Sequence, residues 1–310
     1  MQYDFDLVGK IGSMALIRQE DADIDYNIFS RLGRELRPGM IWVTSGAAEI
    51  GRLDYIKRTG HELSGDSTDI KTDYAAQGQT ILMEQYRRFI RQDYSVRQVL
   101  VEHQHFNDEY KREHIRKLFL RAKEQGAIPI DNNNDPVSDE ENRKWELSVL
   151  RRERREVHEC IDNDETAAVI AGLVSTRVLL IMTSTEGIYA DPKDPSTLVR
   201  DVLAPDAEQL ERKVRALQAH CVGASRAGAN GAHAKLEFAL GPALRGTTVI
   251  IGHGRHRISD LVEGRVPCTR SGSDCGADND ERKLSHAHRT MRSRNRHGRA
   301  VRRGGHRAAV

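Results

Sequence analysis

Short, wholly apolar segments alternate with segments of helical periodicity along most of this chain, and no other feature restricts its possible folds as strongly. Strands are predicted where branched apolar residues follow one another, at residues 5–12 (FDLVGKIG), 40–43 (MIWV), 98–102 (QVLVE), 127–130 (AIPI), 177–182 (RVLLIM) and 247–252 (TTVIIG). Strands that are apolar on both faces are typical of a parallel sheet that helices cover on both sides. The sequence therefore predicts an α/β protein, a three-layer αβα sandwich with an open, mainly parallel sheet.

Helices are predicted between these strands from apolar residues spaced three and four positions apart. The stripes fall at 28–36, 82–90 and 115–122, and further helical segments lie near 164–175, 206–219 and 231–244. A segment dense in charge, residues 140–159, interrupts the alternation and carries only a thin apolar stripe, formed by Trp145, Leu147, Val149 and Leu150. We expect this charged segment to form an exposed helix, either as a solvated face or as a mobile lid.

The composition is that of a globular protein without a membrane segment. Hydrophobic residues make up 38% of the chain and charged residues 30%, and no apolar run approaches the roughly 18 residues that a membrane span needs. The four cysteines form no CxxC pair, so they are interpreted as scattered thiols of a reducing compartment. The N-terminus lacks the basic and apolar regions of a signal peptide. We therefore expect a cytoplasmic protein without a membrane partner.

Positive charge is concentrated at the C-terminal end. Residues 271–310 contain nine arginines and one lysine against four acidic residues, a net charge of +6, whereas the whole chain carries +2. From residue 269 onward aromatic residues are absent and large aliphatic residues are few, so burial cannot offset the entropy lost on ordering. We predict a folded domain at 1–268 and a disordered basic tail at 269–310. A basic tail can bind the phosphates of nucleic acid, but this one lacks aromatic residues that would stack on bases, and we expect no nucleic-acid partner.

Polar clusters follow the predicted strands at the places where each strand ends. They are KIGS (10–13), TSGA (44–47), DNNND (131–135) and TSTEG (183–187), and two further clusters, CIDNDET (160–166) and GANGAHAK (228–235), open helices. Each cluster alone is ordinary turn or cap material, but ligands of such sheets bind outside the carboxyl ends of the strands, where all of them meet. Lysines and short Gly/Ser turns suit a polyphosphate, and carboxylates and amides suit Mg²⁺ and a polar co-substrate. The P-loop, the dinucleotide fingerprint and the protein-kinase motifs are absent.

Seven motifs resemble, in the same order, those of the amino-acid kinase superfamily and, within it, most closely the glutamate 5-kinase family. They are VGKIGS (8–13), VTSGA (43–47), AAQGQTILM (75–83), IPIDNNNDPV (128–137), DNDETAAVIAGLV (162–174), LLIMTSTEGIYADPK (179–193) and GANGAHAKLEFA (228–239). The resemblance, over about residues 5–267, implies an ATP-dependent kinase that phosphorylates the carboxylate of an amino acid, glutamate to glutamyl 5-phosphate, as in proline biosynthesis. It also implies a small-molecule acid as substrate, ATP and Mg²⁺ as cofactors, and a homo-oligomer.

The resemblance also implies a role for each matching residue. Lys10, Lys235 and Asp164 would be catalytic, since the lysines would bridge the β- and γ-phosphates and Asp164 would orient them. Asp162 would orient a lysine or hold Mg²⁺. The acceptor would be bound by Ser45, Gly46, Asp135 and Asn163. The nucleotide would be bound by Lys10, Gly12, Ser13, Thr183, Ser184, Gly228, Asn230, Gly231 and Lys235.

Two other functions stay open. Ser184 stands where the family has an aspartate, and Asn230 stands in a turn where the family has glycine; both differences are compatible with a non-catalytic amino-acid or nucleotide sensor. Between Asp135 and Asp162 lie 26 residues, more than in the family's short loop. A nucleotide-acceptor loop within the charged segment would favour a nucleoside-monophosphate kinase of the same superfamily, such as a UMP kinase. Ser45 and the loop of asparagines and aspartates favour the amino-acid acceptor.

Overall fold

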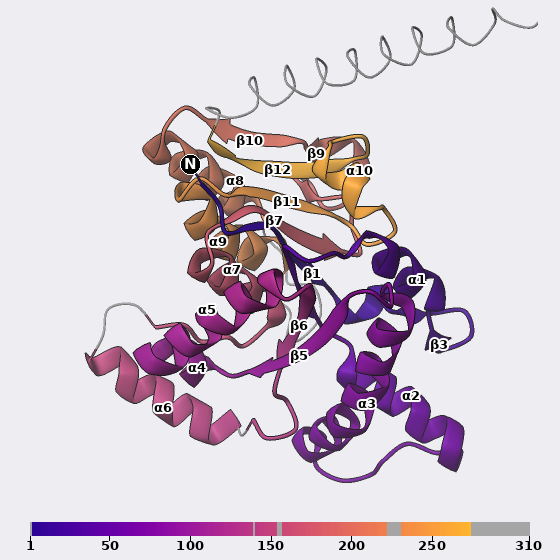
Figure 1. Cartoon of the computed structure of the whole chain (residues 1–310). Coiled ribbons are helices and arrows are strands. Elements are labelled where there is room, and N and C mark those ends of the chain that lie inside the picture. Colours follow the sequence, from indigo (N-terminus) through magenta and orange to yellow (C-terminus); the bar gives the residue numbers. More distant parts are fainter. Residues whose placement is uncertain (1, 139, 154–156, 222–230, 274–310) are drawn as a thin grey trace, which may run out of the picture.

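An eight-stranded sheet runs through the part of the chain that the computed structural model describes, residues 2–138, 140–153, 157–221 and 231–273 (Figure 1). From one edge to the other the strands are β10 (Asp201–Ala204), β12 (Cys268–Ser273), β11 (Thr248–His253), β7 (Thr176–Thr183), β1 (Phe5–Ile11), β4 (Met40–Thr44), β6 (Ala127–Asn133) and β5 (Ser95–Val101). Neighbouring strands are parallel, except that β12 is antiparallel to β11. The predicted open, mainly parallel sheet is confirmed.

Helices cover both faces of the sheet. One apolar core contains side chains of α1 (Tyr26–Glu35), α2 (Ala47–Thr59), α3 (Ser67–Phe89) and α10 (Ile258–Val262). The core on the other face contains side chains of α4 (His103–Asn107), α5 (Glu109–Glu124), α7 (Asn163–Leu173), α8 (Ala207–His220) and α9 (Gly231–Leu244). Two small hairpins, β2 (Ile17–Arg18) with β3 (Asp23–Ile24) and β8 (Ile188–Tyr189) with β9 (Leu198–Val199), complete the described strands.

The central strand β7 shows why its own residues 178–182 are all apolar. Successive side chains of a strand point to opposite faces of the sheet. Leu179 and Ile181 belong to the core under α7 and α9, whereas Val178, Leu180 and Met182 belong to the core under α1 and α3. Both faces of β7 are therefore buried, and the predicted three layers are confirmed.

Two glycines allow α2 and α3 to cross at very short range. A Cβ atom on Gly51 would lie 1.8 Å from the carbonyl oxygen of Tyr74, and one on Gly78 would lie 1.8 Å from that of Ala47. Any side chain at either position would push the two helices apart. Because α2 begins directly after the TSGA turn, this contact also fixes the position of that turn.

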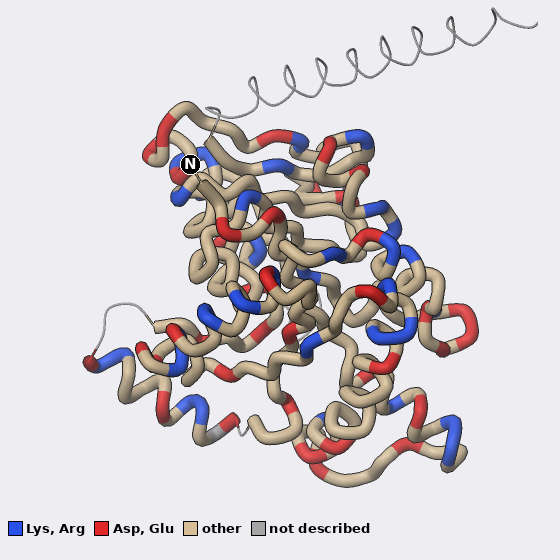
Figure 2. The backbone as a smooth tube through the Cα atoms, in the orientation of Figure 1, with Lys and Arg blue, Asp and Glu red and all other residues tan. Residues whose placement is uncertain are grey.

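The charged segment forms α6 (Glu140–Glu153), which lies against α4 and carries both signs of charge (Figure 2). A helix was predicted here, but it is docked rather than free: Leu147 is buried, and Nε2 of His103 lies 2.7 Å from Oε2 of Glu146. Trp145, predicted to share an apolar stripe with Leu147, is instead 67% exposed. Residues two positions apart do not face the same side of a helix, so the predicted stripe could not form.

The predicted domain boundary at residue 268 is wrong for residues 269–273. They belong to β12, which pairs with β11 and with β10. Thr269 and Ser271 are buried, and Oγ1 of Thr269 accepts a hydrogen bond from the backbone of Ile188 at 2.8 Å. Small polar side chains whose hydrogen bonds are satisfied inside the fold leave no apolar signal in the sequence. Residues 274–310 lie outside the described residues, so the disordered tail stays a prediction for them.

The composition predicted that the chain has no membrane-spanning segment and no paired cysteines, and the described residues bear on both predictions. Among them, no helix combines the length and the apolar character needed to cross a membrane. Cys160, Cys221 and Cys268 are free thiols, and Cys275 lies outside the described residues.

Candidate active site

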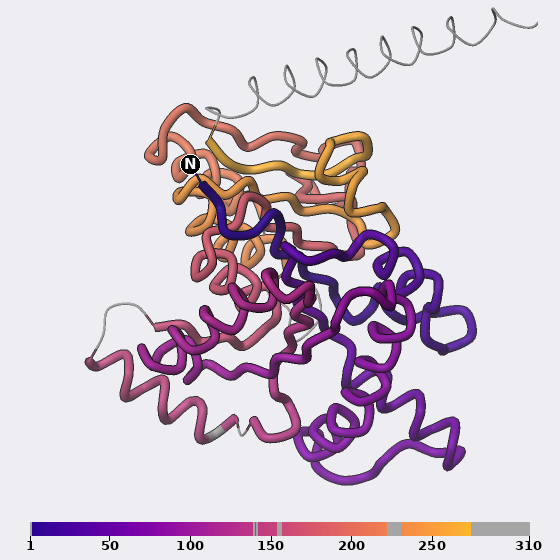
Figure 3. Tube along the Cα trace, in the orientation of Figure 1, coloured from indigo at the N-terminus to yellow at the C-terminus, as the bar shows by residue number. Residues whose placement is uncertain are grey.

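The ends of four neighbouring strands bring the predicted polar clusters to one edge of the sheet. β7, β1, β4 and β6 are adjacent in that order and parallel, although they come from distant parts of the chain (Figure 3). Backbone hydrogen bonds tie the segments that follow them: the N–H of Ser45 donates to the carbonyl of Ile11 at 3.2 Å, and the N–H of Gly12 donates to that of Met182 at 3.3 Å. The segments that follow these strands therefore lie side by side, as expected from the sequence.

Two lysines share one buried carboxylate at this edge. Nζ of Lys10 lies 2.6 Å from Oδ1 of Asp164, and Nζ of Lys235 lies 2.9 Å from Oδ2. Burial by itself would raise the pKa of Asp164, but the charges of both lysines and their hydrogen bonds hold that pKa below its ordinary value. Asp164 therefore stays ionised and holds two cations close together. The structure thus joins the three residues that the sequence predicts to be catalytic.

The three residues come from the ends of one strand and two helices. Lys10 lies near the end of β1, Lys235 on the second turn of α9, and Asp164 on the first turn of α7. Asp162 caps α7, since its Oδ1 accepts hydrogen bonds from the N–H groups of Asp164 at 2.8 Å and Glu165 at 3.0 Å. This cap orients Asp164, and a role of Asp162 in metal binding stays a prediction.

The predicted acceptor turn lies beside this triad. Nδ2 of Asn163 donates to Oγ of Ser45 at 2.9 Å and to Oδ1 of Asn132 at 3.1 Å. Gly46 has a φ of +103°, and a Cβ there would lie 3.1 Å from a methyl carbon of Leu16, so the turn requires glycine. Ser45 and Asn163, neighbours in space and 118 positions apart in the chain, thus form one polar surface next to Asp164.

Gln79 supports this surface, and the sequence analysis gave it no role. Its Oε1 accepts a hydrogen bond from Nδ2 of Asn132 at 2.8 Å, and both side chains are buried. Asn132 in turn accepts from Asn163, so the amides form a chain from α3 to α7. The motif AAQGQTILM contains Gln79 at a helical position facing the sheet, and a polar residue on that face was the available signal.

Asp135 lies farther out, among charges from three helices. Burial raises its pKa, and the negative charge of Glu49 adds to this rise, whereas the positive charges of Lys71 and Arg143 oppose it. Glu49 is on α2, Lys71 on α3 and Arg143 on α6. No hydrogen bond between Asp135 and Ser45 or Asn163 occurs among the described residues, so its part in acceptor binding stays a prediction.

The predicted nucleotide residues are only partly described. Thr183 ends β7, and its carbonyl accepts a hydrogen bond from the N–H of Gly254 at 2.8 Å; Ser184 is exposed. Ser13 begins a short 3₁₀ helix directly after Gly12, and Gly231 begins α9 with a positive φ. These positions surround the lysines. Gly228 and Asn230 lie outside the described residues.

A buried aspartate below the site was not foreseen. The sequence analysis ended the strand at residue 130, but β6 continues to Asn133. Asp131 therefore lies inside the sheet, fully buried, and neither of its carboxylate oxygens has a hydrogen-bond partner among the described residues. Burial raises its pKa well above the ordinary value.

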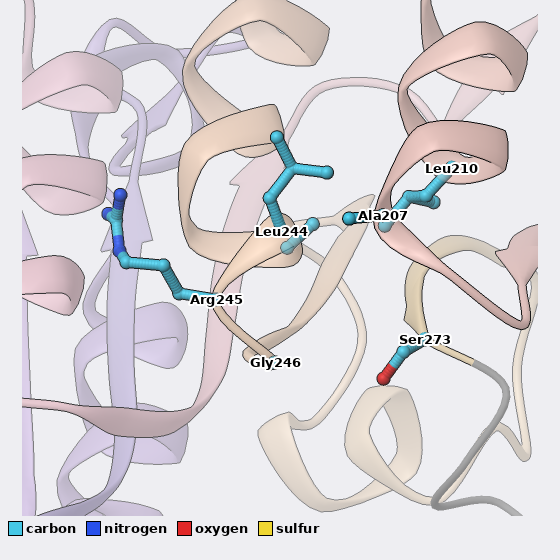
Figure 4. Close-up of a pocket in the computed structure, with 7 residues that line it drawn as sticks. Ala207, Leu210, Leu244, Arg245, Gly246 and Ser273 are labelled. Atoms are coloured by element: carbon cyan, nitrogen blue, oxygen red, sulfur yellow. The ribbon is translucent and has the colours of Figure 1, made fainter.

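One apolar hollow lies away from these residues. It is lined by Ala207, Leu210, Ala243, Leu244, Arg245, Gly246 and Ser273 (Figure 4). The side chain of Arg245 extends away from Leu210, and its guanidinium lies against Gly172. The hollow lies where α9 ends and β11 begins. Lys10 lies near the carboxyl end of β1, so the hollow is at the opposite end of the strands and does not belong to the candidate site.

The charges at the site fit a polyphosphate. Two lysines against one carboxylate leave a net positive charge, and the N–H groups at the starts of α2 and α9 add donors nearby. Among the described residues no group of three His, Cys, Asp or Glu could hold a metal ion. Asp162 stays the predicted protein ligand of Mg²⁺.

Comparison with known sequences shows to which family the chain is similar. The model of the Amino acid kinase family matches residues 7–253. Glutamate 5-kinase of Geobacillus kaustophilus is 30% identical over 84% of this chain and 65% of its own length. Glutamate 5-kinase 1 of Bacillus subtilis is 30% identical over 84% of this chain and 67% of its own length. The chain thus spans about two thirds of the length of these relatives. Glutamate 5-kinase of Alkaliphilus metalliredigens is 26% identical, and the match covers 94% of that protein.

Comparison with solved structures shows the same fold. UMP kinase from Ureaplasma parvum superposes with a TM-score of 0.50 at 12% identity, covering 87% of this chain and 99% of that chain. Giardia carbamate kinase superposes with a TM-score of 0.51 at 12% identity, covering 86% of this chain and 98% of that chain. At this level of identity the similarity shows the fold alone. Together, the comparisons confirm the resemblance that the seven motifs indicate.

Proposed function

Because the chain belongs to the amino acid kinase family, we propose that it transfers the γ-phosphoryl group of ATP to the side-chain carboxylate of glutamate, giving glutamyl 5-phosphate and ADP. The observation that carries this proposal is the pairing of Lys10 and Lys235 on Asp164 directly beside the contact between Ser45 and Asn163. A phosphoryl-binding side and an acceptor-binding side thus lie next to each other. The similarity to glutamate 5-kinases supports glutamate as the acceptor.

The reaction needs positioning and charge more than proton transfer. A carboxylate oxygen of the acceptor forms a bond to the γ-phosphorus while the bond to the β,γ-bridging oxygen breaks, and that electron pair leaves with ADP. Because the attacking carboxylate is already ionised, no protein base is required. Lys10 and Lys235 offset the negative charge on the transferred group and on the leaving phosphate.

Asp164 acts through the two lysines. Two ammonium groups repel each other at short range, and the carboxylate between them allows both to face the same phosphates. The lowered pKa of Asp164 favours the ionised carboxylate that this arrangement needs. Mg²⁺ bound to the phosphates would neutralise further charge.

On the acceptor side, neutral groups provide the donors. Oγ of Ser45 accepts from Asn163 and can donate its own proton to an acceptor oxygen. The φ of Gly46 turns the backbone so that α2 begins immediately after Ser45, and the N-terminus of this helix favours a bound anion. The acceptor carboxylate is thereby held at Ser45, facing the phosphoryl group that the lysines bind.

The proposal is tested with the purified chain, ATP and Mg²⁺, and a panel of L-glutamate, L-aspartate, N-acetylglutamate and UMP. Hydroxylamine converts an acyl phosphate into a hydroxamate, so the expected result is glutamate-dependent hydroxamate with equal release of ADP. The Lys235→Met variant measures the background of contaminating kinases. Release of ADP with UMP but no hydroxamate would replace the proposal with a nucleoside-monophosphate kinase. Saturable binding of glutamate without turnover would replace it with a sensor.

Three expectations accompany this proposal. Use of Mg²⁺ with ATP, assembly into a homo-oligomer and a cytoplasmic location stay predictions that follow from the resemblance to amino-acid kinases.

A further inference from the structure

A chain of side-chain amides reaches the acceptor side from inside the protein. Gln79 of α3, Asn132 of β6 and Asn163 of α7 form this amide chain. Nδ2 of Asn132 donates to Oε1 of Gln79 at 2.8 Å, and Nδ2 of Asn163 donates to Oδ1 of Asn132 at 3.1 Å. Gln79 is 6% and Asn132 is 3% exposed, so solvent is largely excluded from these two amides. The amide chain therefore joins a buried position of α3 to the surface where Ser45 lies.

A backbone group determines which end of each amide faces its neighbour. The N–H of Asn133 donates to Oδ1 of Asn132 at 2.9 Å, and a backbone N–H can only donate. Oδ1 of Asn132 therefore faces Asn133 and Asn163, and its Nδ2 faces Gln79. It follows that Gln79 presents its oxygen to Asn132 and that Asn163 presents its nitrogen. The direction of donation is thus the same at each step from Asn163 to Gln79.

This direction determines what Ser45 offers to a ligand. Nδ2 of Asn163 has two hydrogens and two partners, Oδ1 of Asn132 at 3.1 Å and Oγ of Ser45 at 2.9 Å. Ser45 therefore accepts within the protein, and its own hydroxyl proton is left to donate outward. A carboxylate oxygen, which can only accept, is the complementary group.

Gln79 is well placed to hold the amide chain, because its backbone is fixed. It follows Gly78, where a Cβ would lie 1.8 Å from the carbonyl oxygen of Ala47, the first residue of α2. The acceptor turn and Gln79 thus keep a constant separation. Without Oε1 of Gln79, Nδ2 of Asn132 would be a buried donor without this partner, which is unfavourable. Asn132 would then turn toward another acceptor, and Asn163 would lose the oxygen that orients it.

We propose that Gln79 is a positioning residue of the acceptor side: through Asn132 and Asn163 it holds Ser45 as a hydrogen-bond donor toward a carboxylate oxygen of the acceptor. Gln79 acts only through these side chains and does not touch the substrate. The inference rests on the proposed function, because it requires an acceptor that carries a carboxylate. It adds the reason why a neutral serine favours a group that can only accept hydrogen bonds.

Substitution of Gln79 tests the inference through the KM values of the two substrates. Gln79→Leu removes the oxygen, and Gln79→Asn keeps an amide that is one methylene too short to reach Asn132. Each should raise KM for L-glutamate by about 5- to 10-fold, as expected for one lost hydrogen bond, while kcat and KM for ATP stay within about twofold. Gln79→Glu should keep KM for glutamate near the wild-type value, since a carboxyl oxygen still accepts from Asn132.

Gln85→Leu is the matched control. Gln85 is similarly buried on α3, but its Nε2 donates to the carbonyl of Ile81, at 3.4 Å, and not to the amide chain. Its replacement should leave both KM values unchanged. An unchanged KM for glutamate in Gln79→Leu and Gln79→Asn, or an equal rise in Gln85→Leu, would overturn the inference and leave the proposed function intact.

A double-substitution cycle with Ser45 tests the connection itself. Ser45→Ala removes the donor, so Gln79→Leu should raise KM for glutamate much less in this background than in the wild type. An equal rise in both backgrounds would show that Gln79 acts independently of Ser45, contrary to the inference. Calorimetric titration with glutamate gives the same comparison without turnover. A wild-type chain that neither binds nor phosphorylates glutamate would overturn both proposals.

Discussion

The two sides of the site differ in how their charges are held. On the phosphoryl side, Lys10 and Lys235 meet the buried carboxylate of Asp164, and all three residues come from elements that pack on the central strands. On the acceptor side, Ser45 and Asn163 make a neutral contact, a hydrogen bond of 2.9 Å. The first side thus consists of charges that are paired within the protein, whereas the second offers neutral hydrogen-bonding groups. Under the proposed function, the charged side would act on the phosphoryl group and the neutral side on the acceptor.

The same contrast separates two buried aspartates. Two lysines lower the pKa of Asp164 although burial opposes them, whereas burial alone raises the pKa of Asp131. A buried carboxyl without a partner lowers stability, and a paired one is tolerated. Asp164 is thus stabilised by its two partners, while the unpaired carboxyl of Asp131 destabilises the fold.

Removal of either lysine is expected to have the largest effect. Lys10→Met and Lys235→Met should each lower kcat by about 10²- to 10³-fold, because a positioned charge on the transferred group is lost. Circular dichroism should show an unchanged fold, since the remaining lysine still pairs with Asp164. Lys117→Met, at an exposed position of α5, is the control. Turnover near the wild-type rate in either variant would show that this lysine does not act on the transferred phosphoryl group. It would thereby contradict the proposed difference between the two sides of the site.

Changes on the acceptor side should affect one substrate only. Ser45→Ala and Asp135→Asn should raise KM for the acceptor by about 10-fold while KM for ATP stays the same, because each would remove a contact with the acceptor alone. Initial rates measured over a grid of both substrates separate the two constants. Ser148→Ala on α6, whose hydroxyl contacts only a backbone carbonyl, is the control. A similar rise in both KM values would contradict the division of the site into two sides.

Replacement of Asp131 should stabilise the protein. Asp131→Val removes an unpaired polar group from β6 and supplies a residue suited to a buried strand, so the free energy of unfolding should rise by about 1–3 kcal/mol. Urea unfolding at pH 7 measures this change. Asp131→Asn, which keeps a polar group of the same shape, should give a smaller gain. Destabilisation by Asp131→Val would show that the carboxyl has a structural partner or a functional role.

The pH dependence of this gain should be the smallest effect. The unfolded chain loses the proton of this carboxyl near the ordinary pKa of about 3.9, whereas the folded chain keeps it to higher pH. Folding therefore takes up a proton, and the stability of the wild type falls relative to Asp131→Val as the pH rises above 4. Asp164 has the opposite sign, because its stabilising contribution is lost as the pH falls through its lowered pKa. A difference in stability between wild type and Asp131→Val that does not vary with pH would contradict the assignment.

Much of the fold and of the phosphoryl side could be predicted from the sequence. The apolar runs around β1 and β7 mark buried strands, and the residues that follow a parallel strand must lie at one edge. For this reason Lys10, Ser45 and Asn163 could be placed together before any coordinates were known. The start of a helix after Asp162 could also be predicted, because an aspartate at that position caps the helix.

Other features depend on tertiary contacts that leave no local pattern. Asp131 looks like the end of a strand, and only the pairing of β6 with its neighbours shows that the strand continues. β12 was missed because its small polar residues satisfy their hydrogen bonds within the fold. The position of Arg143 follows from the docking of α6 on α4, which depends on a single buried leucine and one histidine–carboxylate contact.

The division into two sides is tested most directly by measuring the binding of each substrate alone. ATP with Mg²⁺, and L-glutamate, are titrated separately by calorimetry into wild type, Lys235→Met and Ser45→Ala. The account predicts that Lys235→Met weakens the binding of ATP and leaves that of glutamate unchanged, and that Ser45→Ala does the reverse. Weakening of the same ligand by both substitutions would contradict it.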